Sequence, residues 1–280
     1  MKRHEFTAAQ GGPVLPVLRR ELPLLPPHAL RDALKRRDVR VNGRRVGKDA
    51  AVQPGDAVVV YTAQESPGIP VVHEDERCLV VNKPAGVNTD ENDRSGFSLL
   101  SWARERAAGN YDPELVHRLD NRTSGLLVVA KDAQSASLLR EAFRLREVEK
   151  VYACQVRGMP DPRAGVFTAW LTKDAAAARV TVSADRMPGS LRIVTEYETL
   201  ESRDGASLLR VTLHTGRTHQ IRAHLAFLGH PVIGDEVYGD WAENRRHGGG
   251  LRLCAAELAF PEGTKASWLA GMRFRIQPPF

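Results

Sequence analysis

The sequence predicts an α+β protein in which a small basic α+β module precedes a large α+β domain. The chain has 280 residues, 42% hydrophobic and 26% charged, which is enough for one large core and one small core. Basic residues concentrate near the N-terminus, and short apolar or alternating runs typical of strands recur further along, joined by segments with helical spacing. We therefore predict an N-terminal extension over residues 1–14, the small domain over 15–62, a linker over 63–70 and the large domain over 71–280.

Composition excludes several classes of protein. No apolar run approaches the roughly 18 residues of a membrane span, and Met1–Glu5 lacks the apolar core of a secretory signal. We expect a cytoplasmic protein that is a monomer and has no membrane partner. The three cysteines, Cys78, Cys154 and Cys254, are widely spaced and odd in number, which predicts small buried side chains and no disulfide framework or zinc site.

The small domain is predicted from its charge and its turns. After Pro26-Pro27, the apolar residues of 29–34 have the spacing of a short amphipathic helix. Val39–Val41 then alternates into the hairpin turn Asn42-Gly43, and Pro54-Gly55-Asp56 leads to a strand over 57–61. Between His28 and Lys48 the basic residues outnumber Asp32 and Asp38 by six, which accounts for the whole formal charge of +6. These basic residues are Arg31, Lys35, Arg36, Arg37, Arg40, Arg44, Arg45 and Lys48.

A basic helix followed by a basic hairpin suits RNA, because Lys and Arg neutralise phosphates and release counterions. A merely solvated basic face is the ordinary alternative. Residues 63–70 are rich in Pro, Gly and Ser, as linkers are. The large domain then opens with a strand over 78–81 and the turn Lys83-Pro84-Ala85-Gly86, followed by a polar loop over 88–96 to which we assign no role.

The large domain is organised around Leu115–Lys131, which places the carboxylate Asp120 just before a strand. Leu126–Ala130 is a continuous apolar run, typical of a strand covered on both faces. Residues 121–125 are turn formers that can fix a loop through their own backbone. A structural ion pair of Arg118 with Asp120, with His117 and Thr123 satisfying the loop backbone, is the alternative to a working acid.

Two further stretches offer candidate groups. Asp132 is placed to cap a helix over 133–146, and the alternating strand 150–156 carries Tyr152, a residue type that is more often core than catalytic. His214, His219 and His224 recur at intervals of five, which matches no zinc spacing, so no metal is expected. Residues 43–49 fall short of a phosphate-binding loop, so no nucleotide cofactor is expected either.

The string H-R-L-D-x-x-T-S-G-L-L-V-V-A-K over 117–131 resembles the signature of the RluA-type pseudouridine synthases, which isomerise uridines in ribosomal or transfer RNA. The resemblance implies that Asp120 is the catalytic residue. K-x-Y at 150–152 is similar to the family's tyrosine motif, which implies that Tyr152 faces the uracil with Lys150 nearby.

The string G-R-T-H-Q-I-R-x-H-L over 216–225 is similar to another motif of that family. There Arg222 reaches back to Asp120 and keeps it ionised, His224 packs in the core, and the turn at Arg217, Thr218 and His219 meets RNA. Lys83 is expected to support the site. Cys254 stands where the family usually has a histidine.

The small domain resembles an RNA-binding module shared by a small-subunit ribosomal protein, tyrosyl-tRNA synthetases and many of these synthases. The resemblance covers Leu15–Tyr61 and implies that the basic residues named above contact RNA. For the large domain we expect a mixed, mostly antiparallel sheet flanked by helices.

The expected activity is isomerisation of specific uridines to pseudouridine in ribosomal RNA, with the large subunit favoured, or in transfer RNA. The reaction changes neither redox state nor composition, so it requires an ionised carboxylate and a proton shuttle but no cofactor. Because the target lies within stacked RNA, its nucleotide must be flipped out, and Arg118 is placed to fill the gap or grip a phosphate. A non-catalytic RNA-binding or ribosome-assembly factor is the alternative, and an RNA hydrolase lacks a second carboxylate.

Overall fold

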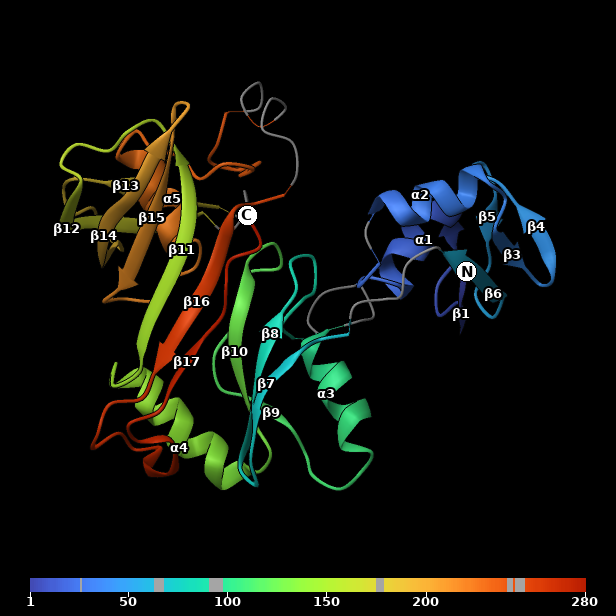
Figure 1. Cartoon of the computed structure of the whole chain (residues 1–280), viewed down its shortest axis with the longest axis horizontal. Helices are drawn as coiled ribbons and strands as arrows, with labels where there is room; N and C mark the ends of the chain where they lie inside the picture. The colour runs from blue at the N-terminus through green and yellow to red at the C-terminus, as the bar shows by residue number, and fades with distance from the viewer. Residues whose placement is uncertain (26, 63–67, 91–97, 175–178, 241–243, 245–249) are drawn as a thin grey trace. The chain divides into compact units, whose positions relative to one another are not determined.

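The structure is a computed structural model that describes residues 1–25, 27–62, 68–90, 98–174, 179–240, 244 and 250–280 (Figure 1). The chain divides into two compact units. The first is Met1–Pro70 with Gly86–Asn110, and the second is Val71–Ala85 with Tyr111–Phe280. Within the described part, no helix is long and apolar enough to cross a membrane.

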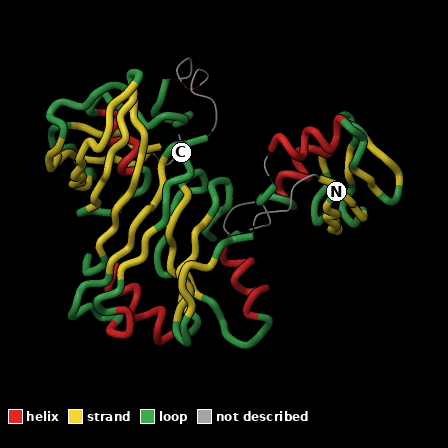
Figure 2. Tube along the Cα trace, in the orientation of Figure 1, coloured by secondary structure: helices red, strands yellow, loops and turns green. Residues whose placement is uncertain are grey.

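In the first unit, the described strands include a four-stranded antiparallel sheet in the order β1-β6-β3-β4, covered by two helices (Figure 2). Its elements are β1 (Lys2–Thr7), β2 (Gly12–Pro13), α1 (Val14–Glu21), α2 (Pro27–Lys35), β3 (Val39–Val41), β4 (Arg44–Val46), β5 (Ala51–Val52), β6 (Ala57–Thr62) and α3 (Leu99–Ala107). The predicted apolar stripe of α2 is buried at Leu30, Ala33 and Leu34, where it packs on Val39 and Val60.

The predicted hairpin turn is confirmed. Asn42 and Gly43 have φ angles of 49° and 79°, the left-handed pair that a two-residue turn requires. The Asn42 side chain also ties this turn to the next one, because its Nδ2 donates to Asp56 Oδ1 at 2.7 Å and its Oδ1 accepts from the Ala57 N–H at 2.9 Å. Arg44 and Arg45 are thereby held on a β-hairpin whose turn is fixed by side-chain hydrogen bonds.

The sheet of the first unit includes a strand, β1, from the segment 1–14 that was predicted as an N-terminal extension. β1 pairs with β6 along its whole length, from Lys2↔Thr62 to Thr7↔Ala57, and β2 pairs with β5. The alternation of β1 is weak in the sequence because its inward residues include His4, whose Nε2 lies 2.8 Å from the hydroxyl of Thr62. Residues 63–67 of the predicted linker and residues 91–96 of the polar loop lie outside the described residues.

The second unit contains a large sheet that is antiparallel except at one position, as predicted. Its described strands follow the order β13-β12-β14-β15-β11-β16-β10-β8-β7, with β17 on β16 and β9 on β10, and β10 runs parallel to β16. The elements are β7 (Val71–Glu74), β8 (Cys78–Lys83), β9 (Glu114–Leu115), β10 (Ser124–Ala130), α4 (Ala133–Arg144), β11 (Glu149–Arg157), β12 (Ala164–Asp174), β13 (Arg179–Ser183), β14 (Leu191–Arg203), β15 (Ala206–Leu213), α5 (Gln220–Phe227), β16 (Leu253–Ala259), η1 (Ser267–Leu269) and β17 (Arg273–Arg275).

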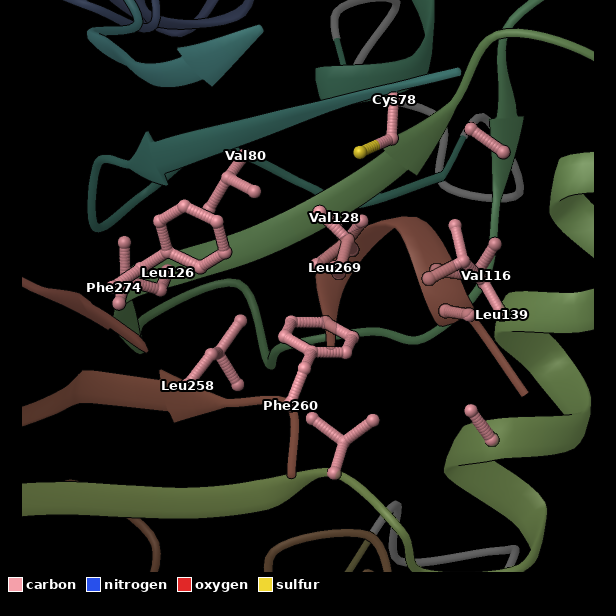
Figure 3. Close-up of a cluster of buried hydrophobic side chains, with 14 of the residues drawn as sticks. Cys78, Val80, Val116, Leu126, Val128, Leu139, Leu258, Phe260, Leu269 and Phe274 are labelled. Carbon is pink, nitrogen blue, oxygen red and sulfur yellow. The ribbon is translucent and has the colours of Figure 1, made fainter. Parts of the chain in front are cut away.

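Helix α4 covers one part of this sheet and α5 another. Leu139 of α4 belongs to the same buried cluster as Val128 of β10 and Phe260, with Cys78 at its edge (Figure 3). The predicted N-cap is confirmed, because the Asp132 side chain accepts from the Ser135 N–H at 2.8 Å. All three cysteines are buried, as predicted, and have free thiols.

Candidate active site

Asp120 lies in the loop between β9 and β10, at the start of the central strand. β10 is buried at every residue, so the loop is anchored in the core. The strand begins at Ser124-Gly125, where β10 and β16 come so close that a Cβ on Gly125, at φ 120°, would lie 2.4 Å from the Ala255 carbonyl oxygen. The Thr123 N–H donates to the Asp120 carbonyl at 3.0 Å, which closes the turn. The Asp120 side chain keeps 25% of its surface exposed.

Asp120 opens into a cleft of about 1120 Å³ between the 116–123 loop, the C-terminal end of α4, the start of β11 and the 212–222 segment. The cleft gathers every catalytic and substrate-binding candidate that the sequence indicated in the large domain. These lining residues are His117, Arg118, Asp120, Lys150, Tyr152, Arg217, Thr218, His219 and Arg222. The basic candidates of residues 31–45 lie in the first unit.

The carboxylate of Asp235 lies closer to Arg222 than the carboxylate of Asp120 does. Its Nε and Nη2 donate to Asp235 at 2.7 and 2.8 Å, whereas its Nη1 lies 3.5 Å from Asp120 Oδ2. Burial would raise the pKa of Asp235, but the hydrogen bonds from Arg222 and from the amides of Val237 and Tyr238 hold it below its usual value. Arg222 is thus fixed by Asp235 and presents its remaining edge to Asp120. No role was predicted for Asp235 from the sequence.

His219 approaches Asp120 from another side. It has a left-handed φ of 53°, its Nε2 lies 3.7 Å from Asp120 Oδ2, and its Nδ1 lies 2.9 Å from the Tyr238 hydroxyl. That hydroxyl oxygen also accepts from the Val180 N–H at 3.0 Å, which fixes Tyr238 and, through it, the His219 ring beside Asp120. Burial lowers the pKa of His219, which favours the neutral imidazole. Tyr238 is a second residue that the sequence did not indicate.

His117 and Lys83 secure the Asp120 loop. His117 Nε2 accepts from the Val128 N–H at 3.0 Å, its ring stacks on Phe143, and burial lowers its pKa to about 3, so it is neutral. The Lys83 ammonium donates to the Pro84 and Asn121 carbonyls at 3.0 and 3.2 Å, and its pKa falls to about 7 through burial, partly offset by Asp120. Because Asn121 directly follows Asp120, this hydrogen bond lets Lys83 hold the Asp120 loop in place.

Tyr152 lies in β11 where the pairing with β16 shifts register, between Val151 and Tyr152. Bulges of this kind re-aim side chains next to active sites. Burial raises the pKa of Tyr152, and the nearby Asp120 carboxylate raises it further. The phenol therefore stays protonated and can donate a hydrogen bond.

The turn before α5 is held by one amide side chain. Gln220 accepts from the Thr215 hydroxyl at 2.8 Å and from the Arg217 N–H at 3.1 Å, and it donates to the Val194 carbonyl. His224 is packed in the core as predicted, with 1% exposed surface and a pKa lowered to about 4 by burial. Arg217 and Thr218 remain exposed at the cleft.

A second group of polar side chains lies outside the cleft. His73, Asp75 and Cys78 come within 4.8 Å of one another. Asp75 already accepts from the Arg77 and Cys78 amides, and burial raises the pKa of the Cys78 thiol to about 12. A thiol that stays protonated is a poor metal ligand, so the group is explained by its own hydrogen bonds.

Several known proteins are similar to this chain in sequence and in fold. Residues 77–227 match the family described as RNA pseudouridylate synthase. The chain is 32% identical over 241 residues to the ribosomal large subunit pseudouridine synthase C of Vibrio cholerae, covering 80% of this chain and 75% of that protein. It is 32% identical over 268 residues to an uncharacterized RNA pseudouridine synthase of Aquifex aeolicus, covering 86% and 82%. The solved structure of human RNA pseudouridylate synthase domain containing 1 gives a TM-score of 0.65 at 26% identity, over 79% of this chain and 87% of that chain.

Proposed function

Because the chain belongs to the RNA pseudouridylate synthase family and is an isomerase acting on RNA, we propose that it modifies uridines of large-subunit ribosomal RNA in the cytoplasm, with Asp120 as the catalytic carboxylate. The position of Asp120 carries this proposal. Of the two carboxylates that line the cleft, Glu149 lies 3.4 Å from Arg273 and is exposed, whereas Asp120 is partly buried beside Arg222 and His219. The substrate class follows from the Vibrio cholerae relative, whose name specifies the ribosomal large subunit.

The chemistry suits the few groups present. The bond between uracil N1 and the ribose must break, the base must turn, and C5 must bond to the ribose in its place, after which the C5 proton is removed. An ionised carboxylate against the sugar and base can form a transient adduct or stabilise the intermediate. The Arg222 guanidinium at 3.5 Å and the His219 Nε2 at 3.7 Å lie beside the Asp120 carboxylate and fix its orientation.

Tyr152 is proposed to pack against the uracil and donate its hydroxyl proton. The Tyr152→Phe variant keeps the ring but removes that hydroxyl, so we expect turnover to fall on the order of 10²-fold while RNA affinity is retained. Single-turnover pseudouridine formation and RNA binding by the same preparation measure both effects. Unchanged turnover would leave Tyr152 with a packing role alone.

Mapping pseudouridines across total RNA tests the substrate class. Cells that lack the gene should lose pseudouridine at discrete positions of large-subunit ribosomal RNA, and the wild-type gene should restore them. Loss confined to transfer RNA would replace the proposed substrate with the other class. No loss at any position would favour a non-catalytic assembly factor.

We further propose that the small domain, residues 1–62, serves as an RNA-binding module, with residues 71–280 carrying the catalysis. Its cations are exposed on α2 and on the β3–β4 hairpin, and Arg40 lies over the Tyr61 ring at 5.9 Å, an arrangement that can receive phosphates and stacked bases. The exposed cations on these elements and in the segment between them are Arg31, Lys35, Arg36, Arg37, Arg44 and Arg45.

Neutralising part of this surface should weaken RNA binding without altering the chemical step. In the full chain, replacing Arg31, Lys35, Arg44 and Arg45 by Gln should flatten the plot of log K against log salt by roughly 0.7 for each phosphate that the protein no longer neutralises. KM should rise while kcat at saturating RNA stays near the wild-type value, since the cleft is unchanged. An unchanged slope would mean that this face is only solvated.

A further inference from the structure

The turn that ends helix α4 contains an arginine with a left-handed backbone, Arg146, just beyond the last helical residue, Arg144. Arg146 has a φ of 61°, its N–H donates to the Phe143 carbonyl at 3.2 Å, and the Glu147 N–H donates to the Ala142 carbonyl at 3.0 Å. This pair of hydrogen bonds is the Schellman ending, in which the left-handed residue is usually glycine. An arginine at this position is strained relative to glycine, so its side chain requires an explanation.

The same feature occurs at the end of α2. Arg37 has a φ of 57°, and the Arg37 and Asp38 amides donate to Leu34 and Ala33 in the same pattern. The other described non-glycine residues with a positive φ are Asn42 and Asp204, which are types that tolerate it, and Ala108 and His219. An arginine therefore replaces glycine at two helix ends, and one of them lies in the module proposed to bind RNA.

Arg146 lines the cleft together with Lys150, and neither pairs with a carboxylate in the part of the chain that the structure describes. Two other arginines of this wall are paired, since Arg140 lies 2.5 Å from Glu114 and Arg144 lies 3.7 Å from Glu141. Among the described residues, no carboxylate lies within the 4.0 Å of a salt bridge from Arg146 or Lys150. Lys150 is half-buried, so its ammonium is also incompletely solvated.

The two cations act on each other. Burial lowers the pKa of Lys150, and the charge of Arg146 lowers it further. A Cβ on Gly216 would crowd Lys150 Nζ at 3.2 Å, so glycine lets the 215–219 turn come close to the ammonium. Arg146, Lys150 and Gly216 all line the cleft. Like charges that line a cleft are stabilised by an anion bound between them.

We propose that Arg146 and Lys150 together hold one phosphodiester of the RNA strand that delivers the target uridine, within the cleft that both residues line. This subsite rests on the proposed function only in that the ligand is taken to be RNA. The subsite explains why an arginine occupies a glycine position, because the helix end carries the guanidinium into the cleft.

Replacing Arg146 by Gly separates binding from folding. Glycine is favoured at this φ, so the melting temperature should rise, whereas affinity for transcribed, unmodified large-subunit ribosomal RNA should fall roughly tenfold. The plot of log K against log salt should flatten by roughly 0.7. Arg146→Asn, which also tolerates a positive φ, should give the same loss of affinity. Unchanged affinity and slope in both variants would overturn the subsite.

Two controls match this variant. Ala108→Gly changes an uncharged left-handed residue, φ 47° at the end of α3, and should raise the melting temperature without weakening RNA binding. Arg163→Gln removes an exposed charge of the second unit outside the cleft and should change affinity by less than about twofold. A loss with Arg163→Gln equal to that with Arg146→Gly would reduce the effect to overall charge.

A double-mutant cycle tests whether the two cations share one phosphate. Lys150→Met alone should weaken binding, and the double variant with Arg146→Gly should lose less than the product of the two single losses. A simple product would overturn the shared subsite. If the wild-type protein makes no pseudouridine in this RNA while Arg146→Gly still weakens binding, the substrate proposal fails and the subsite stands.

Discussion

The Asp120→Asn variant should bind RNA like the wild-type protein and form almost no pseudouridine. Asparagine has nearly the same volume as aspartate but carries no charge, so the cleft keeps its shape while the anion beside Arg222 and His219 is lost. We expect turnover to fall on the order of 10³-fold or more, which is typical for removal of an essential acid or nucleophile. Single-turnover assays on transcribed large-subunit ribosomal RNA, with RNA binding and thermal unfolding measured on the same preparation, provide the check.

Glu149→Gln is the matched control for this variant. It removes the other carboxylate of the cleft, which is exposed and lies 3.4 Å from Arg273. Because it is far less enclosed than Asp120, we expect turnover within about threefold of the wild-type value. Appreciable turnover by Asp120→Asn, or a comparable loss with Glu149→Gln, would remove Asp120 from its assigned role.

The Arg222→Leu variant should lose stability as well as activity. Its main effect falls on Asp235, whose side chain has no exposed surface and would be left as a buried charge without its guanidinium partner. Loss of one partner from a buried pair costs about 3–5 kcal/mol of unfolding free energy. Denaturant unfolding measures this loss. It should be largest above the ordinary Asp pKa of 3.8, where the lowered pKa of Asp235 stabilises the wild-type fold, and should diminish as the pH falls below that value.

The double variant Arg222→Leu with Asp235→Leu separates stability from catalysis. Replacing both charges by apolar side chains should restore part of the unfolding free energy, since the buried charge is removed while the Val237 and Tyr238 amides lose their acceptor. Activity should remain lost, because Asp120 still lacks the guanidinium 3.5 Å away. Recovery of turnover in the double variant would show that Arg222 serves only to neutralise Asp235.

These expectations differ from the pairing that the sequence implied. The resemblance gave Arg222 one carboxylate, Asp120, and the geometry makes Asp235 its closer partner. Asp235 lies 13 residues beyond Arg222, and only the path of the chain after α5 returns it to the guanidinium. The summed charge outside residues 28–48 likewise did not indicate where the cations of the large domain gather. Cations from β11, β15 and the segment after α4, among them Lys150, Arg210 and Arg146, line the cleft, although the residues outside 28–48 are neutral in sum.

Local features were determined by the sequence. The Asn42-Gly43 turn, the Asp132 cap and the buried strand behind Asp120 depend on neighbouring residues, whose backbone preferences and short-range hydrogen bonds can be read in order along the chain. The motifs over 117–131 and 216–225 likewise indicated the family.

Only the tertiary structure decided which distant groups meet. The pairing of β1 with β6, the contact of Tyr238 with His219, and the position of Lys150 beside Gly216 each join segments that the chain brings together by packing. Such pairs leave no periodic signal in the sequence, because a buried charge or hydrogen bond requires a partner at a set distance in space and not at a set interval along the chain.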